Sequence, residues 1–204
     1  MTGTDSDLIG SAKEQADPAA AKDALRRRLR SSRRAFALSL SGVEREAALN
    51  AAAGHAAPLI EPHARVGIYV PTRYEIDPAP CAAHVTRRLL LPWFGERTSP
   101  MQFREAGPLF PGPWKMMQPA HTAAAGEPEI LLVPLLAATS TGDRLGQGGG
   151  HYDRYLAARQ AAGTLPLTIG LAWDCQMVPA LPREPWDHLL DYIVTPSALY
   201  GPHG

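Results

Sequence analysis

Large apolar side chains between residues 19 and 40 recur at intervals of four and seven positions, which return to one face of a helix. Four of them project within about 60° of one another at 100° per residue: Leu25, Leu29, Phe36 and Leu40. This stripe predicts an amphipathic helix over residues 19–40. Ser41 and Gly42 interrupt it, and the alanine-rich stretch after them predicts a second helix over residues 43–57.

Short apolar runs between turn residues predict the strands. These runs cover residues 65–70, 89–91, 130–136, 167–171 and 192–195. Helices are expected over residues 78–88 and 152–162, and the region between residues 92 and 127, broken by prolines and glycines, gives the weakest pattern. Because strands alternate with helices and are apolar throughout, the fold class is α/β: a single three-layer domain with a mostly parallel, Rossmann-like sheet covered by helices on both faces.

The amino-acid composition limits which classes of protein this chain could belong to. Twenty basic and twenty acidic side chains cancel, which argues against a general nucleic-acid binder. Two cysteines are too few for a disulfide framework, and no apolar run approaches the roughly 18 residues of a membrane span. We expect a cytoplasmic monomer that binds neither nucleic acid nor membrane. Residues 1–18, polar and acidic, are expected to be a disordered tail, and residues 19–204 one domain.

The segment TGDRLGQGGGHYDRYL, residues 141–156, is the clearest candidate for chemistry. Its glycines lie between an apolar strand and a helix, where they free the backbone to direct N–H groups at an anion. The alternative is a loop whose glycines only relieve tight packing. Arg144 and Asp153 favour a nucleotide site, because one could pair with phosphate and the other could hold a magnesium ion. Asp153 could also act only as a helix-dipole partner.

The motif RLGQGGGHYDRYL resembles the signature of the 5-formyltetrahydrofolate cyclo-ligase family, including the Val133–Pro134 pair at the end of the preceding strand. The resemblance extends from about Lys22 to Thr195. It implies ATP contacts for Lys22, Arg26, Arg144, Leu145, Gly146, Gln147, Gly148, Gly149, Gly150, His151 and Tyr152. It implies folate contacts for Val70, Glu75, Gln147, Gly148, Gly149, Gly150 and His151, and a magnesium ion held by Asp153 and Asp187.

The basic segment from residue 22 to residue 34 supports part of this assignment independently. Lys22, Arg26 and Arg33 project within about 40° of one another beside the apolar stripe, so they could lean over a bound anion. The alternative is a solvated basic helix face. We favour that alternative for most of the arginines, notably Arg27, Arg28 and Arg34, and exempt only Lys22 and Arg26.

Glu75 also has a physical argument of its own. It follows a predicted strand, and ligand sites of parallel sheets gather at the carboxyl ends of strands. There it could accept hydrogen bonds from a pterin's N–H groups, although a plain surface acid is the alternative.

Two positions depart from the family pattern. Gln118 stands where the family commonly has an acid, so we leave it out of the site. His151 takes a place usually held by an aromatic residue, where it could stack on a ligand and would titrate near neutral pH unless its surroundings shift it.

The resemblance implies a reaction without a protein nucleophile. The formyl oxygen of 5-formyltetrahydrofolate attacks ATP, and N10 then displaces phosphate to give 5,10-methenyltetrahydrofolate. Lys22, Arg26 and Arg144 would stabilise the charge. Two alternatives stay open: a family paralogue with another substrate, and a non-catalytic module that binds folate or nucleotide, or contacts RNA through the basic helix.

Overall fold

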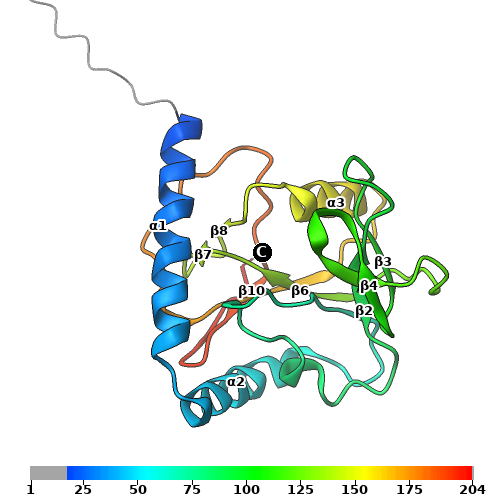
Figure 1. The fold of residues 1–204 in the computed structure, drawn as a ribbon, viewed down its shortest axis with the longest axis horizontal. Helices are drawn as coiled ribbons and strands as arrows, with labels where there is room; N and C mark the ends of the chain where they lie inside the picture. Colours follow the sequence, from blue (N-terminus) through cyan, green and yellow to red (C-terminus); the bar gives the residue numbers. More distant parts are fainter. Residues whose placement is uncertain (1–17, 204) are drawn as a thin grey trace, which may run out of the picture.

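A seven-stranded mixed sheet forms the centre of the computed structural model, which describes residues 18–203 (Figure 1). The strand order is β11-β10-β9-β6-β1-β2-β3. The strands are β1 (Val66–Gly67), β2 (Leu90–Trp93), β3 (Gln102–Glu105), β6 (Ile130–Pro134), β9 (Leu167–Leu171), β10 (Tyr192–Val194) and β11 (Leu199–Tyr200). The five inner strands are parallel, and the edge strands β3 and β11 are antiparallel to their neighbours.

Helices cover both faces of the sheet. The α-helices are α1 (Pro18–Ser39), α2 (Gly42–Ala56) and α3 (His151–Ala161), and the short 3-10 helices are η1 (Ala57–Leu59), η2 (Pro80–Ala82), η3 (Pro113–Lys115) and η4 (Asp174–Gln176). Alternate residues of β6 separate the two cores: Leu132 packs with Ala52 and Ala56 of α2, and Leu131 packs with Leu156 of α3. Figure 1 accordingly shows α3 and α2 on opposite sides of the sheet.

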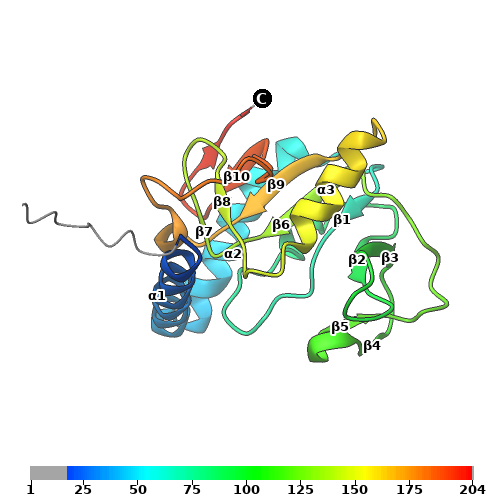
Figure 2. The ribbon, with the colours of Figure 1, turned by 90° about the horizontal axis from the view of Figure 1, so that it is seen from above.

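Two small hairpins and α1 complete the molecule. The hairpins are β4 (Leu109–Pro111) with β5 (Met117–Pro119), and β7 (Ala137–Ala138) with β8 (Arg144–Leu145). Leu29 of α1 packs against Leu136 and Leu145 and so holds α1 beside the second hairpin. Figure 2 shows α1 on one side of the molecule and the β4–β5 hairpin on the other.

The predicted fold class is confirmed: the sheet is mostly parallel and lies between helices. The helix predicted over residues 78–88 is wrong, because only the single turn η2 forms there. Pro80 lacks an amide hydrogen and Pro78 restricts the residue before it, so the chain forms successive turns instead. The strands β3, β4 and β5, which lie in the weakly patterned region between residues 92 and 127, were not predicted from the sequence. The expected tail lies outside the described residues, apart from Pro18.

Two compositional expectations can be compared with the described part of the chain. Between residues 18 and 203, no helix is both long and apolar enough to cross a membrane. Cys81 and Cys175 are free thiols, and burial raises the pKa of Cys81 to about 12 and that of Cys175 to about 11. Both are therefore protonated at neutral pH.

The sheet core leaves no room beside Gly170 in β9. A methyl group there would lie 2.6 Å from Cδ1 of Leu190 and 2.8 Å from Cδ1 of Ile193. We therefore expect Gly170→Ala to lower the free energy of unfolding by about 1–3 kcal/mol, measured by urea denaturation.

The matched control is Gly54→Ala in α2, where a methyl group meets nothing within 4 Å. That substitution should raise the free energy of unfolding by about 0.5–1 kcal/mol, because alanine restricts the unfolded chain. Equal effects at the two positions would contradict this account of the core.

Candidate functional site

The glycine loop joins β8 to the amino terminus of α3. Gly148 and Gly150 have φ values of 104° and 62°, in the left-handed region that favours glycine, and Gly150 is the N-cap of α3. The first helical hydrogen bond runs from the amide of Arg154 to the carbonyl of Gly150, 3.1 Å away. The earlier amides of the first turn have no partner within the helix, and they add to the helix dipole as a site for anions.

A charged cleft of about 720 Å³ opens beside this loop. Its walls come from α1, β8, α3 and the segment before β10. They are formed by Lys22, Arg26, Arg144, Leu145, Gly146, Gly148, Gly150, Asp153, Arg154, Glu184, Trp186 and Asp187. The structure thus brings together the three cations and the two carboxylates that the sequence assigned to ATP and magnesium. The sequence did not single out Glu184 or Trp186.

The cations of the charged cleft are paired with acids. The Arg144 side chain is 5% exposed and donates to Oδ1 of Asp153 at 2.5 Å. Burial lowers the pKa of Arg144, and the charges of Asp153 and Asp187 oppose that shift. Nζ of Lys22 lies 2.8 Å from Glu184 and 3.8 Å from Asp187. An incoming polyphosphate would therefore compete with carboxylates for these cations.

Asp153 and Asp187 were predicted to hold magnesium. Oδ2 of Asp187 accepts a hydrogen bond from the amide of Glu184 at 2.8 Å. The other oxygen of Asp187, Oδ1, and the Oδ2 oxygen of Asp153 accept no hydrogen bond from the described residues. Within residues 18–203, no three His, Cys, Asp or Glu side chains are grouped to hold a metal. Two carboxylates in one cleft do fit Mg²⁺, which prefers few protein ligands completed by water and phosphate oxygens.

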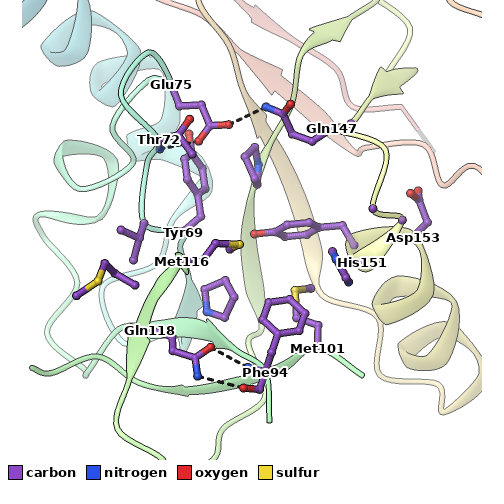
Figure 3. A pocket seen from close by; sticks show the side chains of 18 of the residues that line it. Tyr69, Thr72, Glu75, Phe94, Met101, Met116, Gln118, Gln147, His151 and Asp153 are labelled. Carbon is purple, nitrogen blue, oxygen red and sulfur yellow. Dashed lines mark hydrogen bonds between the residues drawn. The ribbon is translucent and has the colours of Figure 1, made fainter. Parts of the chain in front are cut away.

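A second cleft, of about 980 Å³, lies against the same loop (Figure 3). It is lined by Tyr69, Val70, Thr72, Glu75, Pro92, Phe94, Met101, Met116, Met117, Gln118, Pro134, Arg144, Gly146, Gln147, Gly149, Gly150, His151, Tyr152 and Asp153. The walls are mainly apolar or aromatic. Arg144, Gly146, Gly150 and Asp153 line both clefts, so the two clefts meet at the glycine loop.

Glu75 lines the second cleft, as Val70 does, and is held by three donors. Its Oε1 accepts from Arg33 and from Gln147, each at 3.2 Å, and its Oε2 accepts from the amide of Thr72 at 2.8 Å. The Thr72 and Gln147 bonds are visible in Figure 3. The alternative of a plain surface acid is therefore wrong, because only 8% of the Glu75 side chain is exposed.

His151 packs on protein rings at the edge of the second cleft. Its ring centroid lies 4.9 Å from that of Phe94 and 5.0 Å from that of Trp114. Nδ1 accepts a hydrogen bond from Arg154 at 3.1 Å, which requires Nδ1 to be unprotonated. Burial and the charge of Arg154 lower the pKa of His151.

Gln118, left out of the predicted site, lines the second cleft. Its Oε1 accepts from the amide of Phe94 and its Nε2 donates to the carbonyl of Phe94, both at 3.1 Å. An ionised carboxylate cannot make the second bond. The amide thus has a structural reason to stand at this position.

The expectation of a solvated basic helix face is wrong for Arg33, and it holds for Arg30, which is exposed. Arg33 is buried and pairs with Glu75, while Arg30 donates to Oε1 and to the backbone oxygen of Gln147 at 3.0 and 2.9 Å. Arg27, Arg28 and Arg34 are exposed, as expected. The shared face of Lys22, Arg26 and Arg33 was the signal that could have identified Arg33; nothing local identifies Arg30.

Comparison with known proteins adds to this geometry. A family model described as the 5-formyltetrahydrofolate cyclo-ligase family matches residues 18–196, which is nearly all of the described chain. The chain belongs to this family.

Individual relatives match shorter stretches. The 5-formyltetrahydrofolate cyclo-ligase of Escherichia coli K12 is 47% identical over 72 residues, which are 35% of this chain and 38% of that protein. The mitochondrial cyclo-ligase of Arabidopsis thaliana is 28% identical over 138 residues, 57% of this chain and 50% of the relative. The chain thus spans half or less of the length of these two curated relatives.

Solved structures show the same fold over most of the chain. The NMR structure of Aquifex aeolicus 5,10-methenyltetrahydrofolate synthetase matches with a TM-score of 0.71 and 25% identity, covering 90% of this chain and 93% of that one. A 5,10-methenyltetrahydrofolate synthetase from Mycoplasma pneumoniae matches with a TM-score of 0.64 and 22% identity, covering 86% and 98%. The second likeness concerns the fold alone.

His151 should make stability depend on pH. Because its pKa is lower in the folded than in the unfolded chain, the unfolded chain binds more protons below the ordinary value of 6.5. The free energy of unfolding should fall as pH decreases from 6.5 through the folded pKa, and His151→Gln should flatten that slope. Urea denaturation at a series of pH values measures it. Above pH 7.5 the two slopes should agree, and parallel curves throughout would refute the assignment.

Gln118→Glu tests the pairing with Phe94. At neutral pH the carboxylate would leave the Phe94 carbonyl without its donor in a buried wall, so we expect a loss of about 1–3 kcal/mol in the free energy of unfolding. The loss should shrink at acidic pH, where a protonated carboxyl can donate. Gln102→Glu, at an exposed position in β3, is the control and should change stability little.

Proposed function

We propose that the chain catalyses the ATP- and Mg²⁺-dependent cyclisation of 5-formyltetrahydrofolate to 5,10-methenyltetrahydrofolate, with release of ADP and phosphate. One observation carries the proposal: a cleft rich in cations and an apolar cleft with a buried carboxylate share Arg144, Gly146, Gly150 and Asp153. A nucleotide in one cleft and a folate in the other would meet at the glycine loop, where a phosphoryl group can pass between them.

The nucleotide would bind in the charged cleft. Lys22, Arg26 and Arg144 would pair with its phosphates, together with backbone amides of the loop and the amino terminus of α3. Asp153 and Asp187 would hold Mg²⁺, which supplies charge neutralisation of the phosphates when bound. Displacement of Lys22 from Glu184 would make its ammonium available to an anion.

The folate would bind in the second cleft. Its apolar walls suit a flat pterin, and Glu75 could accept hydrogen bonds from the amino and ring N–H groups of the pterin. Val70, Gln147, Gly149 and His151 line the same cleft. We include reduced folates with or without a polyglutamate tail, and we propose a cytoplasmic monomer as the working form.

The chemistry requires positioning more than a protein nucleophile. The N5-formyl oxygen attacks the γ-phosphorus, the bond to ADP breaks, and an imidate phosphate forms. N10 then attacks the formyl carbon, phosphate leaves with the formyl oxygen, and N10 loses its proton as the five-membered ring closes. The protein must hold the formyl oxygen in line with the γ-phosphate and stabilise the charge with Lys22, Arg26 and Arg144.

Two other functions would use the same clefts. A paralogue could keep the charged cleft and take another substrate in the second cleft, whose wall contains the departure at Gln118. A non-catalytic module would bind folate or nucleotide without turnover. Product formation separates both from the proposed reaction.

The test supplies purified protein with ATP, Mg²⁺ and 5-formyltetrahydrofolate and follows the near-ultraviolet absorbance of the methenyl product. We expect turnover, and Lys22→Met should lower kcat/KM by about a hundredfold or more, because it removes a phosphate-facing charge. Arg27→Met, on an exposed position of the same helix, should leave kcat/KM unchanged. ATP binding without product would exclude the proposal in favour of a paralogue or a binding module.

A further inference from the structure

Arg33 is a buried cation for which the proposed reaction has no direct use. Its side chain is 6% exposed and that of its partner Glu75 is 8% exposed, with Nη1 3.2 Å from Oε1. Arg33 does not line either cleft, whereas Glu75 lines the second one. The guanidinium therefore supports the carboxylate from behind the wall of the cleft.

Stability alone gives little reason for this pair. Burying two charges costs desolvation that their attraction often fails to offset, and well-packed apolar residues are commonly as stable. The Arg33 pair is also incompletely satisfied: Nε is buried with no hydrogen-bond partner among residues 18–203, and Nη1 reaches the Leu135 carbonyl at only 3.4 Å. An imperfect buried pair at a cleft wall points to a role for the carboxylate it holds.

The contacts of Glu75 show what Arg33 contributes. An ionised carboxylate has about four acceptor positions, and three are taken by Arg33, Gln147 and the Thr72 amide. Arg33 is the only charged one among these donors, so it supplies the compensating charge. The other two are neutral groups that line the cleft themselves. The remaining position, on Oε2, accepts no hydrogen bond from the part of the chain that the structure describes, so a ligand could use it.

The surroundings make that compensating charge necessary. Tyr69 and Tyr152 lie in the same wall, and their pKa values are raised first by burial and then by the negative charge of Glu75. Both phenols therefore stay neutral and cannot compensate for the carboxylate. Without Arg33, the hydrogen-bond donors that Glu75 keeps among the described residues would all be neutral, and the buried carboxylate would turn away from the cleft.

We propose that Arg33 is a positioning residue for the folate: it holds the Glu75 carboxylate, with its charge compensated, in the orientation that accepts hydrogen bonds from the pterin. This inference rests on the proposed function and adds a residue to it. Arg33 acts through Glu75 and touches neither substrate.

The experiment combines steady-state kinetics with a double-mutant cycle. Arg33→Met should raise KM for 5-formyltetrahydrofolate by about tenfold or more and leave KM for ATP within about twofold, because it removes the contact with Glu75 and a long contact with the Leu135 carbonyl, neither of which lies in the charged cleft. Arg33→Lys, which keeps the positive charge but lacks the planar guanidinium group, should raise KM for the folate less than Arg33→Met does. Arg34→Met is the matched control, since Arg34 is exposed and only lies over the Tyr74 ring.

The cycle distinguishes positioning from a purely structural role. If Arg33 acts through Glu75, Arg33→Met with Glu75→Gln should be no worse in KM for the folate than Glu75→Gln alone. The inference would be overturned if the effects of the two substitutions on KM for the folate multiplied in the double variant. It would also be overturned if Arg33→Met lowered the melting temperature and left both KM values unchanged. If Arg33→Met alone does not fold, the double variant still answers, because it removes both buried charges.

Failure of the proposed function can be recognised separately. Absence of turnover in the unmodified protein would exclude the reaction, and direct titration of folate binding would then replace KM in the same cycle. Folate affinity that falls in Arg33→Met, but not further in the double variant, supports the positioning role even so. An unmodified protein that binds no folate overturns both proposals.

Discussion

The parallel pairing of β6 with β9 and β1 is the constraint on which the rest of the molecule depends. Because these strands are buried between α2 and α3, they run in one direction and their carboxyl ends meet at one edge of the sheet. The segments that leave this edge carry Glu75, the glycine loop and Asp187, which are distant in sequence. The edge thereby collects functional groups as open α/β sheets generally do.

The sequence could predict those parts of the fold and of the site that depend on the pattern of neighbouring residues. Uniform apolar runs identified the parallel strands, and glycines between a strand and a helix identified the loop, because each signal lies within a few neighbouring residues. The β4–β5 hairpin escaped prediction because Gln118 of β5 is held by both backbone groups of Phe94, which lies 24 positions away in the sequence. Arg33 escaped for the same reason: its partner lies 42 positions away, so charge alone could not distinguish it from its exposed neighbours.

The charged cleft explains how a protein with no net charge can offer an anion site. Its cations are countered at short range by Asp153, Glu184 and Asp187, so the field is confined to the cleft. Binding of an anion would exchange partners instead of introducing a new charge into a low-dielectric wall. A magnesium ion at the released carboxylates would complete that exchange, and nucleotide and metal would favour each other.

The helix α1 also fixes the distance between two parts of the site. Lys22 lies in the charged cleft and Arg33 behind Glu75, and the two lie eleven positions apart along one continuous helix. Eleven residues are almost three turns of 3.6, so both side chains lie on one face, about 16 Å apart along the axis. The span between the charged cleft and the Glu75 carboxylate is therefore set by helical pitch. A single residue inserted between them would turn one end by about 100° and misalign both clefts together.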